Sequence, residues 1–193
     1  MDSDLRKGLS EARQLIVSGE IVKGLSKFAH LIDLWPNIFT IRLELAEVLI
    51  SLRWKRQAAE IFEAAARYFC QAGFPLMAIY ALKRLGDVDP ELIDSPMQML
   101  ISTYEYGSKK IGNFQITDYP SFSLDYAREI ESLGDKEGEW ISLLTRMATD
   151  LKDIKNYPKN LPVIPILSSL NQENFDIDMT ICGEVYLIST FEG

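Results

Sequence analysis

Side chains that could catalyse a reaction are scarce in this chain. His30 is the only histidine among the 193 residues, and it lies between Ala29 and Leu31 in an apolar stretch. A zinc site would need further ligands at suitable spacing, and a Ser/His/Asp or Cys/His site would depend on this one histidine. We therefore interpret His30 as a capped or partly exposed core histidine.

The two cysteines, Cys70 and Cys182, do not indicate a site either. They are far apart in the sequence and form no CxxC spacing, so neither a disulfide framework nor a zinc site is expected. Cys70 follows Phe69 in an apolar stretch, and we interpret it as a buried, inert thiol.

Carboxylate pairs occur at Glu129 and Glu131 and at Glu137 and Glu139. Residues two positions apart point to different sides of a helix, so these pairs favour a solvated acidic face over general acid–base catalysis. The phosphate-loop, dinucleotide, metalloprotease and EF-hand motifs are all missing from the sequence. We predict no catalytic residue, no metal site and no cofactor, and hence a protein that is not an enzyme.

The formal net charge of −8 is unevenly distributed. Residues 1–90 carry 12 basic and 11 acidic side chains, whereas the remaining 103 residues carry 8 and 17. A chain of this kind lacks the basic footprint of a nucleic-acid-binding protein. No stretch approaches the roughly 20 apolar residues of a membrane span, and the acidic N-terminus is unlike a secretory signal. We expect a cytoplasmic protein.

Apolar residues recur at helical spacing along most of the chain. Short turns divide the first part into helices, and at Ser18–Gly19–Glu20 the glycine is expected to end a helix in a left-handed conformation. We expect at least six helices between residues 4 and 152, packed as antiparallel pairs. The expected ranges are 5–16, 21–35, 43–52, 54–72, 75–85, 91–106, 123–133 and 140–151, with a loop over 107–122.

The first 90 residues also repeat themselves. Residues 19–28 align with residues 53–62 at an offset of 34 residues, and a third match follows 20 residues later. The alignment places the small residues Gly24, Ala58 and Ala78 at equivalent positions, as paired helices need where they approach closely. In this interpretation the long helix 54–72 closes one repeat and opens the next.

In its 34-residue period and in its order of small, large, Gly and Pro residues, this region resembles the tetratricopeptide-repeat (TPR) family. The family's Trp in the first helix is replaced by Gly8 and Arg42, and its Leu-Gly pair by Glu11-Ala12 and Leu45-Ala46. The resemblance implies helix pairs stacked in a right-handed superhelix. It also implies a partner bound in the groove that the first helix of each pair lines.

The resemblance carries over to a set of groove positions that mix apolar and charged side chains, which suits an amphipathic helix or an extended peptide. These positions are Arg6, Leu9, Arg13, Ile16, Val17, Thr40, Leu43, Glu47, Ile50, Glu60, Glu63, Arg67 and Gln71. The Lys/Asn arrangement with which some family members clamp a C-terminal carboxylate is absent. The same positions would face water or a neighbouring helix in a protein that does not use its groove.

Three cations, Arg53, Lys55 and Arg56, stand at the start of the expected fourth helix, where the helix dipole does not favour positive charge. Scattered solvated charge explains most clusters of this kind. The functional interpretation is a docking patch for an acidic partner segment, or for the acidic second half of this chain.

Residues 154–193 differ in character from the rest. Three prolines, at 158, 162 and 165, predict an extended linker, and the β-branched and aromatic residues of 182–191 predict a strand. Residues 161–175 resemble the lead-in to a bacterial cyclic-nucleotide-binding domain. The Arg-x-Ala cassette with which that family binds its ligand is missing, so nucleotide binding is not expected.

These observations predict an all-α, TPR-like domain over residues 1–153, followed by a Pro-containing linker and tail over 154–193. The leading hypothesis is a non-catalytic adaptor or scaffold in bacterial regulation, which binds a peptide or helix of a protein partner, with an acidic partner favoured. The alternative is the helical regulatory or oligomerisation half of a cyclic-nucleotide-type bacterial sensor. The sequence leaves the oligomeric state open.

Overall fold

The computed structural model describes residues 3–72, 74–107 and 124–150. This part of the chain is mostly helical and contains no strand, which confirms the all-α prediction for these residues. Its elements are α1 (Ser3–Val17), α2 (Ile21–Leu34), α3 (Thr40–Ser51), α4 (Lys55–Ala72), α5 (Pro75–Val88), the 3-10 helix η1 (Pro90–Leu92), α6 (Asp94–Gly107), α7 (Ala127–Ser132) and α8 (Glu137–Thr149). The linker and strand expected over 154–193 lie outside the described residues.

Local signals set the helix boundaries. Gly19 follows α1 with a φ of 86°, the left-handed conformation expected of it. The helix expected from residue 91 begins at Asp94 instead. It is preceded by the short η1, where the Asp89 carboxylate accepts a hydrogen bond from the Glu91 amide at 3.2 Å. Pro96 stands in the first turn of α6, where a missing N–H costs no hydrogen bond.

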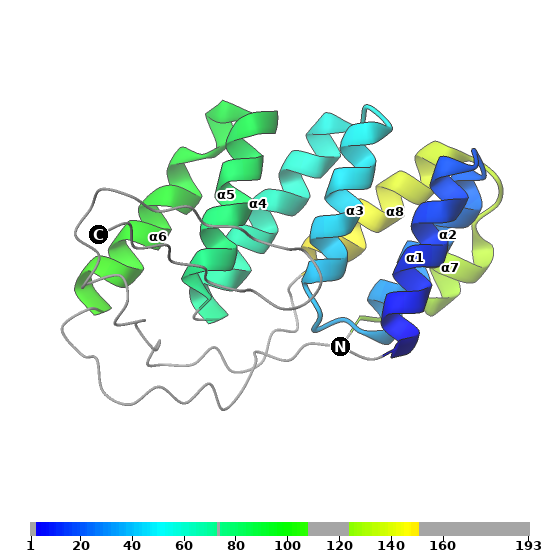
Figure 1. Cartoon of the computed structure of the whole chain (residues 1–193), viewed down its shortest axis with the longest axis horizontal. Helices are drawn as coiled ribbons and strands as arrows, with labels where there is room; N and C mark the ends of the chain where they lie inside the picture. The colour runs from blue at the N-terminus through cyan, green and yellow to red at the C-terminus, as the bar shows by residue number, and fades with distance from the viewer. Residues whose placement is uncertain (1–2, 73, 108–123, 151–193) are drawn as a thin grey trace, which may run out of the picture.

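The helices pack as antiparallel neighbours in chain order (Figure 1). The closest packing joins α1 to α2, α3 to α4 and α4 to α5. The C-terminal helix α8 departs from this order, because it packs against α2 and α4 rather than against α6. In Figure 1 it runs obliquely behind α3, so α1, α3 and α5 keep one side of the molecule free of it.

One hydrogen-bond pattern recurs at three helix–helix turns. In each turn a backbone N–H reaches the carbonyl five residues earlier, and a small residue four positions later donates to the turn residue's own carbonyl. The first type of bond joins Glu20 to Leu15 at 2.9 Å, Trp54 to Leu49 at 2.8 Å and Phe74 to Phe69 at 2.8 Å. The second joins Gly24 to Glu20 at 3.0 Å, Ala58 to Trp54 at 3.1 Å and Ala78 to Phe74 at 3.0 Å. These offsets are those of the sequence alignment, 34 and then 20 residues.

Small residues lie where the helices approach closely. Ala58 and Ala78 are both fully buried. A Cβ atom added at Gly24 would lie 2.6 Å from Cδ1 of Ile16 and 3.0 Å from the backbone oxygen of Ala12. Larger side chains at these positions would therefore push the paired helices apart.

Arg42, which the sequence resemblance aligned with the Trp of the TPR family, is fully buried. Its Nη1 donates a hydrogen bond to the Pro36 carbonyl at 2.7 Å, and its guanidinium carbon lies 4.3 Å from the centroid of the Phe39 ring. Phe39 in turn stacks on Tyr68 with centroids 3.7 Å apart. Burial lowers the pKa of Arg42 to about 9, so the side chain stays protonated at neutral pH. A cation packed over an aromatic ring thus occupies this buried position.

The cysteine and the histidine considered as possible reactive residues occupy different environments. Cys70 is buried, as predicted. His30 is exposed on α2. Among the described residues, no group of His, Cys, Asp and Glu side chains is arranged to hold a metal ion. No helix in the described ranges combines the length and apolar character that a bilayer crossing requires.

Candidate binding surface

Charged side chains on α1, α3 and α5 form one row of interhelical ion pairs. Arg13 on α1 lies 3.4 Å from Glu44 on α3, measured from Nε to Oε2. Glu47, one turn after Glu44 on α3, pairs with Arg84 on α5. The α1–α3–α5 face is therefore a continuous surface whose three helices are cross-linked by ion pairs.

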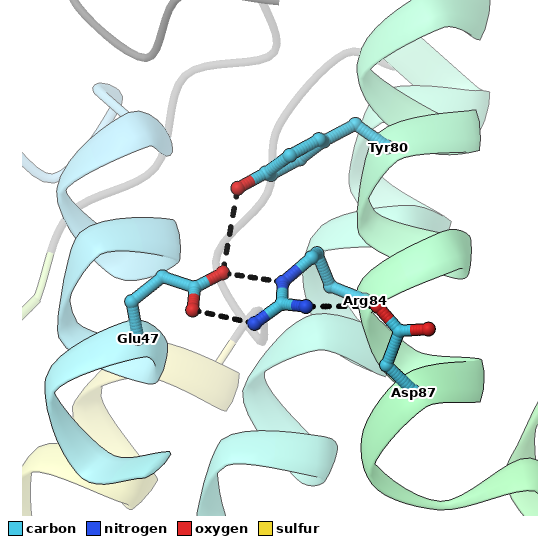
Figure 2. A network of polar contacts seen from close by, with 4 residues as sticks. All are labelled: Glu47, Tyr80, Arg84 and Asp87. Carbon is cyan, nitrogen blue, oxygen red and sulfur yellow. Dashed lines mark hydrogen bonds and ion pairs between the residues drawn. The ribbon is translucent and has the colours of Figure 1, made fainter. Parts of the chain in front are cut away.

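The pair between α3 and α5 has the better geometry (Figure 2). Arg84 donates from Nε to Oε1 of Glu47 at 2.6 Å and from Nη2 to Oε2 at 2.7 Å, a bidentate contact. Its third nitrogen donates to the Asp87 carboxylate at 2.8 Å. The Tyr80 hydroxyl donates to Oε1 of Glu47 at 3.4 Å. This network fixes the direction of four polar side chains on the face.

These contacts change the acidity of the groups involved. The hydrogen bonds to Glu47 raise the pKa of Arg84 and so favour its protonated form. Burial, together with the negative charge of Glu47, raises the pKa of Tyr80 to about 12. Burial also raises the pKa of Glu44, and the nearby Arg13 offsets this only in part.

Two apolar residues that the TPR resemblance assigned to the groove are core residues instead. Leu9 is 2% exposed and Leu43 is 0% exposed. The hydrophobic stripe of each helix turns toward its paired helix, so these leucines cannot contact a partner, and this part of the prediction is corrected. Ile16 and Ile50 are half-buried and pack against the same core.

Other residues at the predicted positions are accessible. Arg6 is exposed, and the Arg13 side chain is 52% exposed. Val17 is 87% exposed and lies one helical turn after Arg13, which places it on the same side of α1. On α5, Ile79 is 38% exposed, but it lies on a different side of the helix from Tyr80 and Arg84, which face Glu47. The exposed apolar residue of this face is therefore Val17.

The three cations predicted as a docking patch are all exposed. Arg53 has a φ of 68°, the left-handed conformation. Arg56 pairs with Glu60 one turn along α4 at 3.3 Å, and the side chain of Arg56 is 86% exposed. Between them, Trp54 is half-buried and donates from Nε1 to Oε1 of Glu137 at 3.1 Å.

The contact between Trp54 and Glu137 concerns the hypothesis that the basic residues dock the acidic second half of this chain. Glu137 opens α8, so an acidic element from the second half of the chain does reach the start of α4. It is held there by the Trp54 indole, a neutral donor, and the cations of the patch remain exposed beside it.

Arg67 belongs to another part of the molecule. It forms an ion pair with Glu63 at 2.9 Å on its own helix and donates to Oγ of Ser95 at 2.9 Å. Its guanidinium thus joins α4 to α6. The structure does not bring it together with the row of ion pairs on α1, α3 and α5.

Sequence reasoning missed the partners of Glu47. Tyr80 and Arg84 are four residues apart on α5, so they share one helix face and both reach the same carboxylate. That spacing was visible in the sequence. The 37-residue separation between Arg84 and Glu47 was not predictable without the helix packing.

We compared the chain with protein-family models, with curated proteins and with solved structures, and none of the three comparisons finds a match.

Proposed function

We propose that this protein is a non-catalytic, TPR-like adaptor that binds a protein partner on its α1–α3–α5 face. The observation that carries the proposal is the row of interhelical ion pairs, Arg13 with Glu44 and Glu47 with Arg84. The bidentate Glu47–Arg84 pair holds polar side chains in fixed positions on this face, and fixed positions lower the entropy cost of binding. The recurring turn hydrogen bonds at the aligned positions support the TPR-like part of the proposal.

The partner we propose is an acidic peptide or amphipathic helix. Charge steering would come from Arg53, Lys55 and Arg56, which are exposed, while an apolar contact would come from Val17. Arg53 adds a specific argument. A non-glycine residue in the left-handed conformation costs free energy, and residues held in this way are frequent at functional sites.

The test begins with affinity capture, using the full chain as bait, and continues with binding kinetics on the purified partner. Changing Arg53, Lys55 and Arg56 to Glu should slow association more than it speeds dissociation. The effect should shrink at high salt, because exposed charges are screened beyond a Debye length of about 8 Å. Arg128→Glu, an exposed charge reversal on α7, is the control and should have a much smaller effect.

The apolar contact predicts the opposite kinetic behaviour. Val17→Ser should raise the dissociation rate, and the effect should depend little on salt, because short-range contacts act after the encounter. If neither set of variants changes binding while removal of residues 154–193 abolishes it, the proposed face is wrong and the tail is the binding element.

A further inference from the structure

The α1–α2 hairpin is joined to the rest of the molecule mainly through α8. Its direct packing on α3 is slight, and α2 and α4 make little contact with each other. By comparison, α8 packs extensively against both α2 and α4. The helix that is last in the described sequence therefore lies between the first hairpin and the α3–α6 body.

The burial of α8 indicates that it fills this space. Its apolar side chains are almost completely covered: Trp140, Ile141, Leu143, Leu144, Met147 and Ala148 are all at most 4% exposed. Ser142 and Arg146, on the other side of the helix, are exposed. Because packed helix axes stand about 8–10 Å from one another, α8 keeps the axes of α2 and α4 apart.

Polar contacts fix both ends of α8. At its start, Glu137 accepts from the Trp54 indole of α4 at 3.1 Å, and Trp140 donates from Nε1 to the Gly134 carbonyl at 2.7 Å. At its end, Asp150 accepts from the Tyr126 hydroxyl at 2.7 Å. These contacts hold both ends of α8 in place on α4 and α7.

On the opposite side of the molecule, one ion pair joins α1 to α3 among the described residues. Arg13 and Glu44 form this pair, which is long at 3.4 Å, and the Arg13 side chain is half exposed. A contact of this kind contributes little stability and does not fix an angle between helices. This ion pair does not set the orientation of α1 relative to α3 and α5, and α8 makes the more extensive packing with the hairpin.

We propose that α8 is a wedge that sets the angle between the α1–α2 hairpin and the α3–α6 body, and so sets the shape of the α1–α3–α5 face. Looser docking of α8 changes the spacing between α1 and α5 and weakens binding of the partner. Only this last step rests on the proposed function. The first step concerns the shape of the free protein.

Distances between spin labels test the wedge without any partner. Ser10→Cys on α1 and Lys83→Cys on α5 are exposed attachment sites. Cys182→Ser removes one native thiol, while Cys70 is 1% exposed and is protected from labelling. A second pair, Lys55→Cys with Lys83→Cys, lies wholly within the α3–α6 body and serves as the reference distance.

Two variants loosen α8 to different degrees. Leu144→Ala removes a fully buried side chain, and Trp54→Phe removes the indole N–H donor to Glu137 together with part of a half-buried ring system. Ser142→Ala, on the exposed side of the same helix, is the control. We expect the α1–α5 distance to shift by several ångströms and its distribution to broaden in Leu144→Ala, with a smaller shift in Trp54→Phe. The reference distance should stay unchanged in all three variants.

An unchanged α1–α5 distance in Leu144→Ala, with circular dichroism showing a folded protein, would overturn the wedge. So would a broadening of both distances together, because α8 would then be an ordinary part of one cooperative core. A changed distance with unchanged partner affinity would overturn only the coupling to binding. Loss of the proposed face would appear instead as unchanged affinity in Val17→Ser, which lies on that face.

Discussion

Arg53 adopts, 34 residues further along the chain, the same left-handed turn conformation as Gly19. Gly19 has a φ of 86° and Arg53 a φ of 68°. The amide of each donates to the carbonyl three residues earlier, at 3.1 Å from Gly19 to Ile16 and 2.9 Å from Arg53 to Ile50. The two turns are equivalent, but only the first has a glycine, which adopts this conformation without steric cost.

This difference predicts opposite effects of two substitutions on stability. Arg53→Gly should raise the free energy of unfolding by about 0.5–1 kcal/mol, because relief of left-handed strain exceeds the added chain entropy. Gly19→Ala should lower it by about 1 kcal/mol, since nothing in its surroundings compensates the strain. Urea denaturation measures both. A loss of stability in Arg53→Gly would show that the Arg53 side chain stabilises the fold.

Two helical glycines should differ in their tolerance of a methyl group. In Gly24→Ala the added Cβ meets Ile16 and the backbone of Ala12, which cannot move, so we expect a cost of roughly 1–3 kcal/mol. In Gly8→Ala the Cβ meets the end of the Leu31 side chain at 2.7 Å, which can rotate away. The gain in helix propensity of about 1 kcal/mol should then leave this variant close to neutral. Thermal unfolding of both variants compares them directly, and equal losses would contradict the prediction.

Overpacking tests the repeat alignment. Ala58→Leu and Ala78→Leu should each lower stability by roughly 1–3 kcal/mol, because both alanines are fully buried between helices. Ala127→Leu, at an exposed position on α7, is the matched control and should change little. Chemical denaturation is the measurement. A neutral result at both buried positions would mean that they do not lie at close helix contacts.

The link between α3 and α5 can be measured with a double-mutant cycle. Glu47→Gln and Arg84→Met should show a coupling energy of about 0.5–1 kcal/mol, at the upper end for partly exposed pairs because the contact is bidentate. The same cycle on Arg56 and Glu60, a more exposed pair with one close contact, is the reference and should give a smaller coupling. Couplings of equal size would show that the bidentate geometry adds nothing to stability.

The raised pKa of Glu44 predicts a pH-dependent effect of Glu44→Gln. In the folded state this carboxyl group has a raised pKa and keeps its proton to a higher pH than an exposed glutamate does, because burial disfavours its charge. Its contribution to stability is therefore fully present below the unfolded pKa and is lost as the pH rises through the folded pKa. The stability of Glu44→Gln relative to the wild type should be higher at pH 7 than at pH 4, as measured by urea denaturation. A difference of the opposite sign would mean that attraction to Arg13 dominates.

Local features of the sequence determined the helices and the turns between them. The apolar periodicity, Gly19 and the prolines act within a few residues of where they stand, because helix formation and termination depend on nearby backbone groups. The equivalence of Gly24, Ala58 and Ala78 was also visible, since small side chains recur wherever paired helices approach.

Tertiary packing decided which residues remain on the surface and which helices meet. Leu9 and Leu43 have the spacing of groove residues, but their helices turn that side toward the paired helix, and burial of apolar surface selects this orientation. Contact between Trp54 and Glu137 spans 83 residues, and it depends on the docking of α8 against α2 and α4. Helical periodicity specifies an apolar side for each helix but not the helix that covers it, because many partners bury the same area. The choice of partner is made only when the whole core packs without gaps or clashes.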